Sequence, residues 1–524
     1  MMSIPLRSLR AAAARFSPGT HAYAPLTNPG ASPAETAATD SSALPPRSPL
    51  ARLLAFLFFL LPSFIQRRLR PSSAKPRRLY PTSWLDGLRG VASLIVFFCH
   101  YTEGNMGVYV HSYGVRNDSD KVASSPLQLP FLRVLYSGRP MVHIFFVISG
   151  FVLSHKSLKL LRKRDYDTLH KTLASSVFRR GFRLFLPTTA STFIIMLLIR
   201  WGWMGTPLPS FWAQLFDWKD AVWRITFSWN WDITQFLPYD VHLWTIPIEM
   251  SHSLLLFITL TGLSRMKTYL RLPALFAIMI YCLKCGHWAA FEFLGGMGIA
   301  EIGMIQEKRR EREAAAEEEK EAALGDIEAM NGGGSSSSSS SIEKLPRLSS
   351  STARRVFQGF LIVNLIFALF VAGWPNHDAE VTPGIAALWR NTMEPFHTIG
   401  GDLVSFPWFA LGSIQVVVAL QQIKPLQNLF TTPLAQYLAD ISYALYLCHG
   451  PVLDVFAHRW MPSIWGLVGG YENAGMWGRM LVWFLGVLAL GVPTIWSSDL
   501  FWRTVDVKSV EFARWLESVC IRDD

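Results

Sequence analysis

Repeated apolar runs of about 20 residues constrain this chain more than any other feature, because each can cross a hydrocarbon core of about 30 Å. We therefore expect an all-α fold, a polytopic membrane helical bundle with about ten transmembrane helices. By length and hydropathy the spans fall at residues 86–104, 141–160, 183–202, 242–262, 271–285, 287–305, 356–374, 403–421, 434–456 and 476–497.

Composition agrees with a membrane protein. Hydrophobic residues make up 50% of the chain and charged residues only 17%, whereas soluble proteins carry roughly 25% charge. A water-soluble enzyme is therefore disfavoured. The formal charge of +11 does not indicate nucleic acid as a partner, because the basic residues lie beside apolar runs and act as topology determinants.

The distribution of basic residues predicts the topology. The connection between the second and third spans is strongly basic, with Lys156, Lys159, Arg162, Lys163, Arg164, Lys171, Arg179, Arg180 and Arg183. The positive-inside rule places this connection and both termini in the cytosol. The opposite face carries one glycosylation sequon at Asn117. Together with the serine-rich loop and the long first tail, the sequon favours a eukaryotic endomembrane of the ER or Golgi.

Composition shifts divide the chain into one membrane domain with flanking segments. We expect a disordered or targeting tail, an interfacial helix with a basic juxtamembrane segment, the membrane domain and a cytosolic C-terminal tail, at residues 1–48, 49–79, 80–502 and 503–524. A charged and serine-rich cytosolic loop, residues 306–355, interrupts the membrane domain and is expected to be a solvated helix followed by a flexible linker.

The first span carries an arginine and a histidine on one helical face. Arg89 and His100 are eleven positions apart, about 16 Å along a helix with about 20° of angular offset. A histidine can accept a proton near neutral pH, and an arginine at the cytosolic end suits a phosphate-bearing donor. On spacing alone, a histidine bonded to a neighbouring helix and an arginine snorkelling to headgroups are the more frequent roles.

Further polar positions occur in later spans. Arg180 and Arg183 share a face and form a plausible phosphate clamp, although membrane anchoring is the commoner role of such a pair. Glu249 lies in a polar stripe of the fourth span. It suits a functional role, orienting a catalytic imidazole or contacting an acceptor hydroxyl, and pairing with an intramembrane basic group equally well. His449 in the ninth span lines a cavity together with these polar residues, or it has a helix-capping or packing role. His143 is a weaker candidate.

Several chemistries lack their motifs. The chain has no Gly-rich phosphate loop, no H-E-x-x-H and no G-x-S-x-G. Cys282 and Cys285 form one lone C-x-x-C pair, which favours packing over zinc or redox chemistry. We therefore expect no metal.

The order of these segments resembles that of a known family. Leu85-Asp86-Gly87-Leu88-Arg89-Gly90 opens the first span, which closes on His100, and Arg180-x-x-Arg183, Leu243-Trp244 to Glu249, and Ile441-Ser442-Tyr443 to His449 follow. This series resembles the acyltransferase 3 family of integral membrane O-acyltransferases, in a eukaryotic, fungal-type form. The similarity runs from about Tyr80 to Trp502.

The resemblance implies a function and a set of roles. Members move an acyl group, often acetyl, from cytosolic acyl-CoA to hydroxyls of sugars, lipids or small metabolites. Arg89, Arg180 and Arg183 would hold the CoA phosphates, and His100 would be the essential catalytic histidine, with Glu249 and His449 lining the cavity as orienters. The chain lacks the fused lumenal hydrolase-like domain of bacterial polysaccharide-modifying members, so the acceptor class does not transfer.

Two alternatives stay open at this point. Within the acyltransferase hypothesis, His100 acts as a general base on the acceptor hydroxyl, or it is transiently acylated. Outside that hypothesis, intramembrane His, Glu and Arg are also expected in a proton-coupled small-molecule permease. A degenerate scaffold is a third, less favoured hypothesis, because both arginine signatures and His100 are present.

Overall fold

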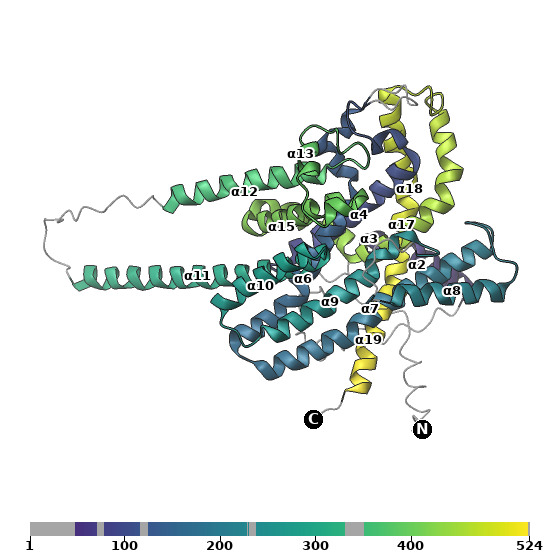
Figure 1. Ribbon diagram of the computed structural model, residues 1–524. Coiled ribbons are helices and arrows are strands. Elements are labelled where there is room, and N and C mark those ends of the chain that lie inside the picture. The colour runs from purple at the N-terminus through teal and green to yellow at the C-terminus, as the bar shows by residue number, and fades with distance from the viewer. Residues whose placement is uncertain are drawn as a thin grey trace.

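The computed structural model is a bundle of helices (Figure 1). It describes residues 48–70, 78–115, 124–227, 229, 237–330 and 350–521, and no strand occurs in this part of the chain. The all-α membrane fold is thereby confirmed. The first tail up to residue 47, residues 71–77 of the basic segment, the sequon and the serine run lie outside the described residues.

Each of the ten expected spans corresponds to a helix. These helices are α4 (Ser83–Asn105), α6 (Gly138–Lys163), α7 (Tyr166–Arg200), α9 (Thr245–Gly262), α10 (Thr268–Lys284), α11 (Trp288–Met330), α12 (Ser350–Ala372), α15 (Phe406–Gln422), α17 (Pro433–Gly466) and α18 (Met476–Phe501). Among the described residues, seven helical segments are long and apolar enough to span a membrane, so the count of ten is not confirmed. Helices α4, α10 and α17 are outside that set; α4 and α17 carry polar residues of the site described below.

Shorter elements connect and cover the bundle. They are α2 (Pro49–Leu60), α3 (Ser63–Leu69), η2 (Gly107–Val110), η3 (Pro126–Gln128), α5 (Pro130–Arg133), η4 (Val134–Tyr136), α8 (Phe211–Thr226), η5 (Val241–Trp244), α13 (Ile385–Arg390), α14 (Phe396–Ile399), η6 (Gly401–Ser405) and α16 (Lys424–Phe430). Helix α11 continues from its buried half into the Arg/Glu/Ala-rich stretch, and it projects from the bundle beside α12 (Figure 1).

Helices α4 and α17 lie in close contact and run in the same direction. A Cβ on Gly90 of α4 would lie 2.3 Å from the backbone nitrogen of Ala439 of α17, so only glycine permits this approach. Ten residues further along each helix, His100 and His449 have ring centres 5.2 Å apart. Small residues are the usual means by which membrane helices pack closely. This contact fixes the register between the two helices that carry the histidines.

The C-terminal segment is helical. Helix α18 passes through a π-helical turn (Trp502–Asp506) into α19 (Val507–Cys520), which packs against α7. Glu517 forms an ion pair with Arg179 at 3.1 Å, and the rings of Phe512 and Phe182 lie 6.3 Å apart. These contacts fix α19 to α7.

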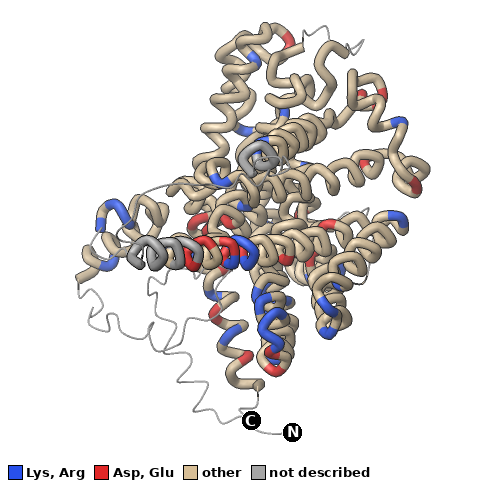
Figure 2. The backbone as a smooth tube through the Cα atoms, turned by 90° about the vertical axis from the view of Figure 1, so that its left-hand side faces the viewer, with Lys and Arg blue, Asp and Glu red and all other residues tan. Residues whose placement is uncertain are grey.

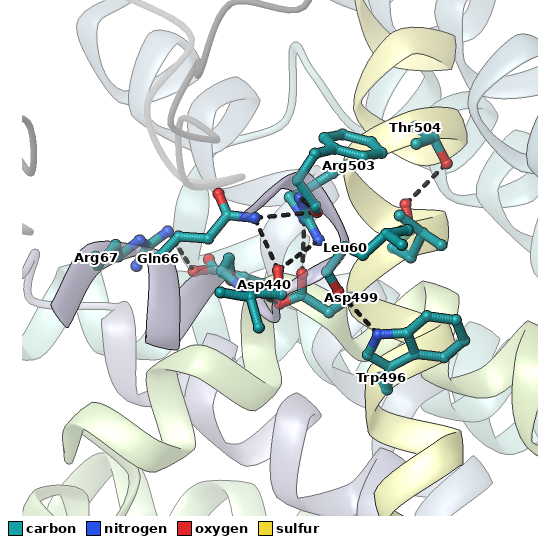
Figure 3. Close-up of polar contacts among 12 residues, drawn as sticks. Leu60, Gln66, Arg67, Asp440, Trp496, Asp499, Arg503 and Thr504 are labelled. Atoms are coloured by element: carbon teal, nitrogen blue, oxygen red, sulfur yellow. Dashed lines mark hydrogen bonds and ion pairs between the residues drawn. The ribbon is translucent and has the colours of Figure 1, made fainter. Parts of the chain in front are cut away.

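The corner between α2 and α3 is fixed to α18 by a buried carboxylate (Figure 3). Asp499 is fully buried and accepts hydrogen bonds from the backbone N–H and hydroxyl of Ser63, at 2.9 and 2.6 Å, and from Arg503 at 2.7 Å. Arg503 also donates to the carbonyl of Leu61 at 3.0 Å, and the Trp496 indole donates to that of Leu60 at 2.8 Å. The N-terminal helices are therefore anchored to the end of the last long helix.

Replacing Asp499 should loosen this corner. In Asp499→Ala the guanidinium of Arg503 loses its charged partner, and breaking such a buried pair costs about 3–5 kcal/mol. We expect a clearly lower thermal unfolding midpoint in detergent. Asp402→Ala is the matched control, because its carboxylate is 64% exposed and pairs with Arg139 at the surface, where a pair is worth about 0–1 kcal/mol. Equal midpoints for the two variants would contradict the anchoring role.

Charge is unevenly distributed over the bundle. Figure 2 shows many Lys and Arg residues on the helix ends near the C-terminus, while much of the rest of the bundle is tan, apart from scattered charges and the charged stretch of α11. Helix α6 ends at its C-cap Arg164, which has a left-handed backbone at φ 59°, and α7 begins two residues later at Tyr166. A charge-poor middle between charged ends is the pattern expected of a multi-pass membrane protein.

Candidate active site

A cavity of about 150 Å³ lies between α4, α6, α7, α9 and α17. Arg89 of α4 and Arg180 and Arg183 of α7 all line it. The structure thus brings together the three arginines that the sequence singled out, although the segments that carry them lie about ninety residues apart. Three guanidinium groups around one cavity can bind an anionic group such as a phosphate.

Glu249 belongs to this arginine cluster. Its carboxylate pairs with Nη2 of Arg180 in a short hydrogen-bonded contact, and Arg180 Nε donates to the hydroxyl of Ser253 at 2.9 Å. Both partners of the pair are largely buried, at 9% and 13% exposure. Of the roles considered from sequence, the described residues show the charge pair; orienting an imidazole or contacting an acceptor hydroxyl stays a prediction.

The other two arginines are held by their own neighbours. Arg89 Nε donates to the hydroxyl of Ser442 at 3.1 Å, and Arg89 lies 3.6 Å from the carboxylate of Asp86. Asp506 lines the cavity as well and acts electrostatically on Arg183 and Arg89. It comes from the π-helical turn after α18, a distortion that often occurs at functional sites. Sequence analysis missed Asp506 because it assigned that residue to a tail.

The rest of the cavity wall is mainly apolar and ends at a tyrosine. Helices α6 and α9 contribute most of its apolar residues, namely Val142, Phe145, Phe146, Ile148, Val152, Leu153 and Ile246. Tyr446 of α17 also lines the cavity, and its hydroxyl bonds to Thr245 Oγ1 at 2.7 Å and to the backbone carbonyl of His242. Tyr446 therefore lies between the arginine cavity and a second group of polar residues.

That second group is a cluster of three histidines. The ring centres of His100 and His242 are 4.1 Å apart, those of His242 and His449 4.7 Å, and those of His100 and His449 5.2 Å. The rings come from α4, η5 and α17 respectively. We call these three residues the histidine trio. The structure confirms neither His100 nor His449 as catalytic, but it places them in direct contact.

Each ring of the trio has one nitrogen next to an acceptor. His100 Nδ1 lies 3.1 Å from Glu103 Oε2, His242 Nδ1 lies 2.7 Å from Asp240 Oδ1, and His449 Nδ1 lies 3.2 Å from the carbonyl of Leu445. An acceptor at Nδ1 favours the tautomer with the proton on Nδ1. The lone pair of each imidazole is then on Nε2, where it can take a proton or a metal ion.

Sequence analysis did not assign His242, Asp240 or Glu103 to the site. His242 and His252 lie in the same polar stripe as Glu249, but the stripe divides in the structure, because His252 Nδ1 bonds to the carbonyl of Ile248 instead. A local signal existed in Asp240-x-His242, because Asp240 caps η5 and accepts from both the backbone N–H and the ring of His242. Gly450 of α17 leaves room for this ring, since a Cβ there would lie 2.7 Å from His242 Nδ1.

The weaker candidate His143 is outside both clusters. Its ring is buried against Trp288, Phe406 and Phe409 and forms a short contact with the buried carboxylate of Glu292. The pair ties α6 to α11, a structural role of the kind that polar groups in membrane bundles often have.

Comparisons with known proteins agree with this picture. A family model described as an acyltransferase domain, Acyl_transf_3, matches residues 82–503. The "O-acetyltransferase PaAT-1" of Phomopsis amygdali is 31% identical over 514 residues, which cover 91% of this chain and 92% of that protein. No solved structure matches the chain significantly.

Two further fungal relatives are more distant. "Acyltransferase R4" of a Phoma species is 26% identical over 79% of this chain and 92% of its own length. "Acyltransferase clz18" of Cochliobolus lunatus is 25% identical over 83% of this chain and 93% of its own length. Of the functions considered from sequence, these relatives support the acyltransferase and offer nothing for the permease.

Proposed function

The chain belongs to the Acyl_transf_3 family of acyltransferases, and from this premise we propose that it is an O-acyltransferase that uses the arginine cavity for acyl-CoA and the histidine trio for the acceptor. It is a multi-pass membrane enzyme. The observation that carries the proposal is the adjacency of the two clusters: Tyr446 contacts the backbone of His242 and also lines the arginine cavity.

The donor end follows from charge. Arg89, Arg180 and Arg183 would hold phosphate groups of CoA, because guanidinium groups form charge-assisted, often bidentate bonds to phosphate. Glu249 keeps Arg180 in place. The guanidinium of Arg180 uses two of its five N–H groups to bond to Glu249 and Ser253. The apolar wall from α6 and α9 then suits the uncharged arm and the acyl group. We propose acetyl-CoA as donor, with the arginine end facing the cytosol.

The transfer step uses His100 as a general base. The hydroxyl proton of the acceptor passes to Nε2 of His100 while the oxygen attacks the thioester carbonyl, forming the C–O bond. Collapse of the tetrahedral intermediate breaks the C–S bond, and the CoA thiolate receives the proton from the imidazolium. Glu103 keeps the second ring nitrogen protonated and stabilises the positive charge that forms. His449 and His242 enclose the ring of His100.

The acceptor would reach the trio from the side opposite the arginines. We propose a hydroxyl on a sugar, a lipid or a small metabolite, in an ER or Golgi membrane with both termini in the cytosol. No metal is part of this step.

The proposal is tested by supplying membranes that contain the protein with acetyl-labelled CoA and an extract of hydroxylated metabolites. Label should enter an ester that mild alkali cleaves; label confined to amides would contradict O-acylation.

Direct transfer and an acyl-histidine route give different results with donor alone. In direct transfer no covalent enzyme intermediate forms, so we expect no label on purified protein after incubation with labelled acetyl-CoA and rapid denaturation. Label that is present in the wild type and absent from His100→Ala would favour transient acylation of the imidazole. Cys99→Ala is a necessary control, because the Cys99 thiol lies next to His100 in the chain.

A further inference from the structure

We propose that the histidine trio binds one divalent transition-metal ion, with Zn²⁺ the best match, through one ring nitrogen each of His100, His242 and His449. These ligand atoms lie within 4.8 Å of one another. Ligand nitrogens around tetrahedral zinc lie roughly 3.3 Å apart, given Zn–N distances of about 2.0–2.1 Å. Small rotations of the three side chains can close the remaining gap.

The surroundings of the trio are those of a metal-binding histidine set. In such sites each ligating histidine donates its other N–H to a carboxylate or a backbone carbonyl, which fixes the tautomer and ring orientation. Here Glu103, Asp240 and the Leu445 carbonyl take this place for all three rings. Three independent segments supply the acceptors, so one local motif does not account for the pattern.

A buried polar atom at the centre points to a missing partner. His449 is 1% exposed, and its Nε2 has no hydrogen-bond partner among the described residues. Leaving such an atom unsatisfied costs about 1–3 kcal/mol, so a buried histidine of this kind needs an explanation. A metal ion bonded to this Nε2 would satisfy it.

The charge around the trio favours a cation. Two carboxylates, Glu103 and Asp240, lie directly behind two of the rings, and one oxygen of Asp240 is buried without a partner. The two negative carboxylates offset the two positive charges of a divalent ion, and the three imidazoles coordinate it as neutral ligands. Three histidines would leave the fourth position of zinc open, as in catalytic zinc sites. Imidazole ligands suit Zn²⁺, Cu²⁺, Ni²⁺ and iron, whereas Mg²⁺ and Ca²⁺ prefer oxygen.

Metal binding would control the proposed reaction, and this consequence rests on the proposed function. An ion on Nε2 of His100 occupies the lone pair that removes the proton from the acceptor. We therefore expect added Zn²⁺ to lower acyl transfer in proportion to occupancy and a chelator to restore it. If activity instead requires Zn²⁺, the general-base role of His100 is wrong while the metal site remains.

The binding test is independent of activity. Protein purified in detergent is stripped with a chelator, dialysed and titrated with Co²⁺, whose visible absorption reports coordination, and then with competing Zn²⁺. We expect about one ion per chain and at least about 100-fold weaker binding in His242→Ala and His449→Ala. His458→Ala is the matched control, because this exposed histidine lies nine residues further along α17.

A milder variant protects the test against misfolding. Asp240→Asn keeps all three histidines and removes only the carboxylate behind His242; we expect about 10–100-fold weaker binding, the usual effect of losing such a partner. Wild-type protein that takes up no more metal than His449→Ala would overturn the inference. If the protein binds the metal but transfers no acyl group after a chelator has removed it, the proposed function is overturned and the metal site stands.

Discussion

His100→Ala should lower kcat for acyl transfer by about 10²–10⁴-fold, the usual contribution of a positioned general base. His100 is the residue of the trio whose Nδ1 faces the carboxylate of Glu103, and that contact prepares Nε2 to take the acceptor proton. The arginine cavity does not include His100. We therefore expect the KM for acyl-CoA to change little while kcat falls.

The control for this variant is His458→Ala, which alters an exposed ring on α17 away from the trio. Its kcat should equal that of the wild type at matched protein levels. Glu103→Gln is an informative intermediate, since the amide still accepts a hydrogen bond but does not stabilise an imidazolium. It should lower kcat less than His100→Ala does. A His100→Ala enzyme that retains a tenth or more of wild-type kcat would contradict the base assignment.

Arg183→Gln should raise the KM for acyl-CoA by about 10–100-fold. A hydrogen bond to a charged group contributes about 1.5–3 kcal/mol, and each 1.4 kcal/mol corresponds to about a tenfold change in affinity. The sharper test compares acyl-CoA with acyl-pantetheine, which carries the same thioester but no phosphate. If Arg183 binds phosphate, the variant should weaken the response to acyl-CoA and leave that to acyl-pantetheine unchanged.

Arg179→Gln is the matched control for the donor assignment. Arg179 precedes Arg180 on α7, but its side chain pairs with Glu517 of α19 and does not line the cavity. We expect its KM for acyl-CoA to stay near the wild-type value. Equal losses for both donors in Arg183→Gln, or equal effects in the two arginine variants, would place the phosphates elsewhere.

The positions of the helices were largely predictable from the sequence. Apolar runs of span length identified all ten long helices, and the helical spacing of Arg180 and Arg183 correctly placed them on one face. The order of short motifs identified the family. These are local signals, in which residues close in sequence determine both the element and its exposed face.

The assembly of the site was less predictable, because it depends on contacts between distant segments. His242 lies beside His100 and His449 because Asp240 caps η5 and because Gly450 of α17 leaves room for the His242 ring. Glu249 suited several roles in the sequence, and the position of Arg180 across the helix contact brings the two into a charge pair. Asp506 reaches the cavity through a π-helical turn, a backbone feature that hydropathy does not reveal.

The central claim is that this membrane protein transfers an acyl group from CoA to a hydroxyl, and it is tested most directly by acceptor-dependent release of CoA. Purified protein in lipid would receive acetyl-CoA with and without a pool of hydroxylated acceptors. We predict that CoA thiol appears only with the acceptors and in step with ester formation, and that His100→Ala releases none above background. CoA release that is the same in wild type and His100→Ala, across acceptor pools and longer acyl donors, would contradict the account.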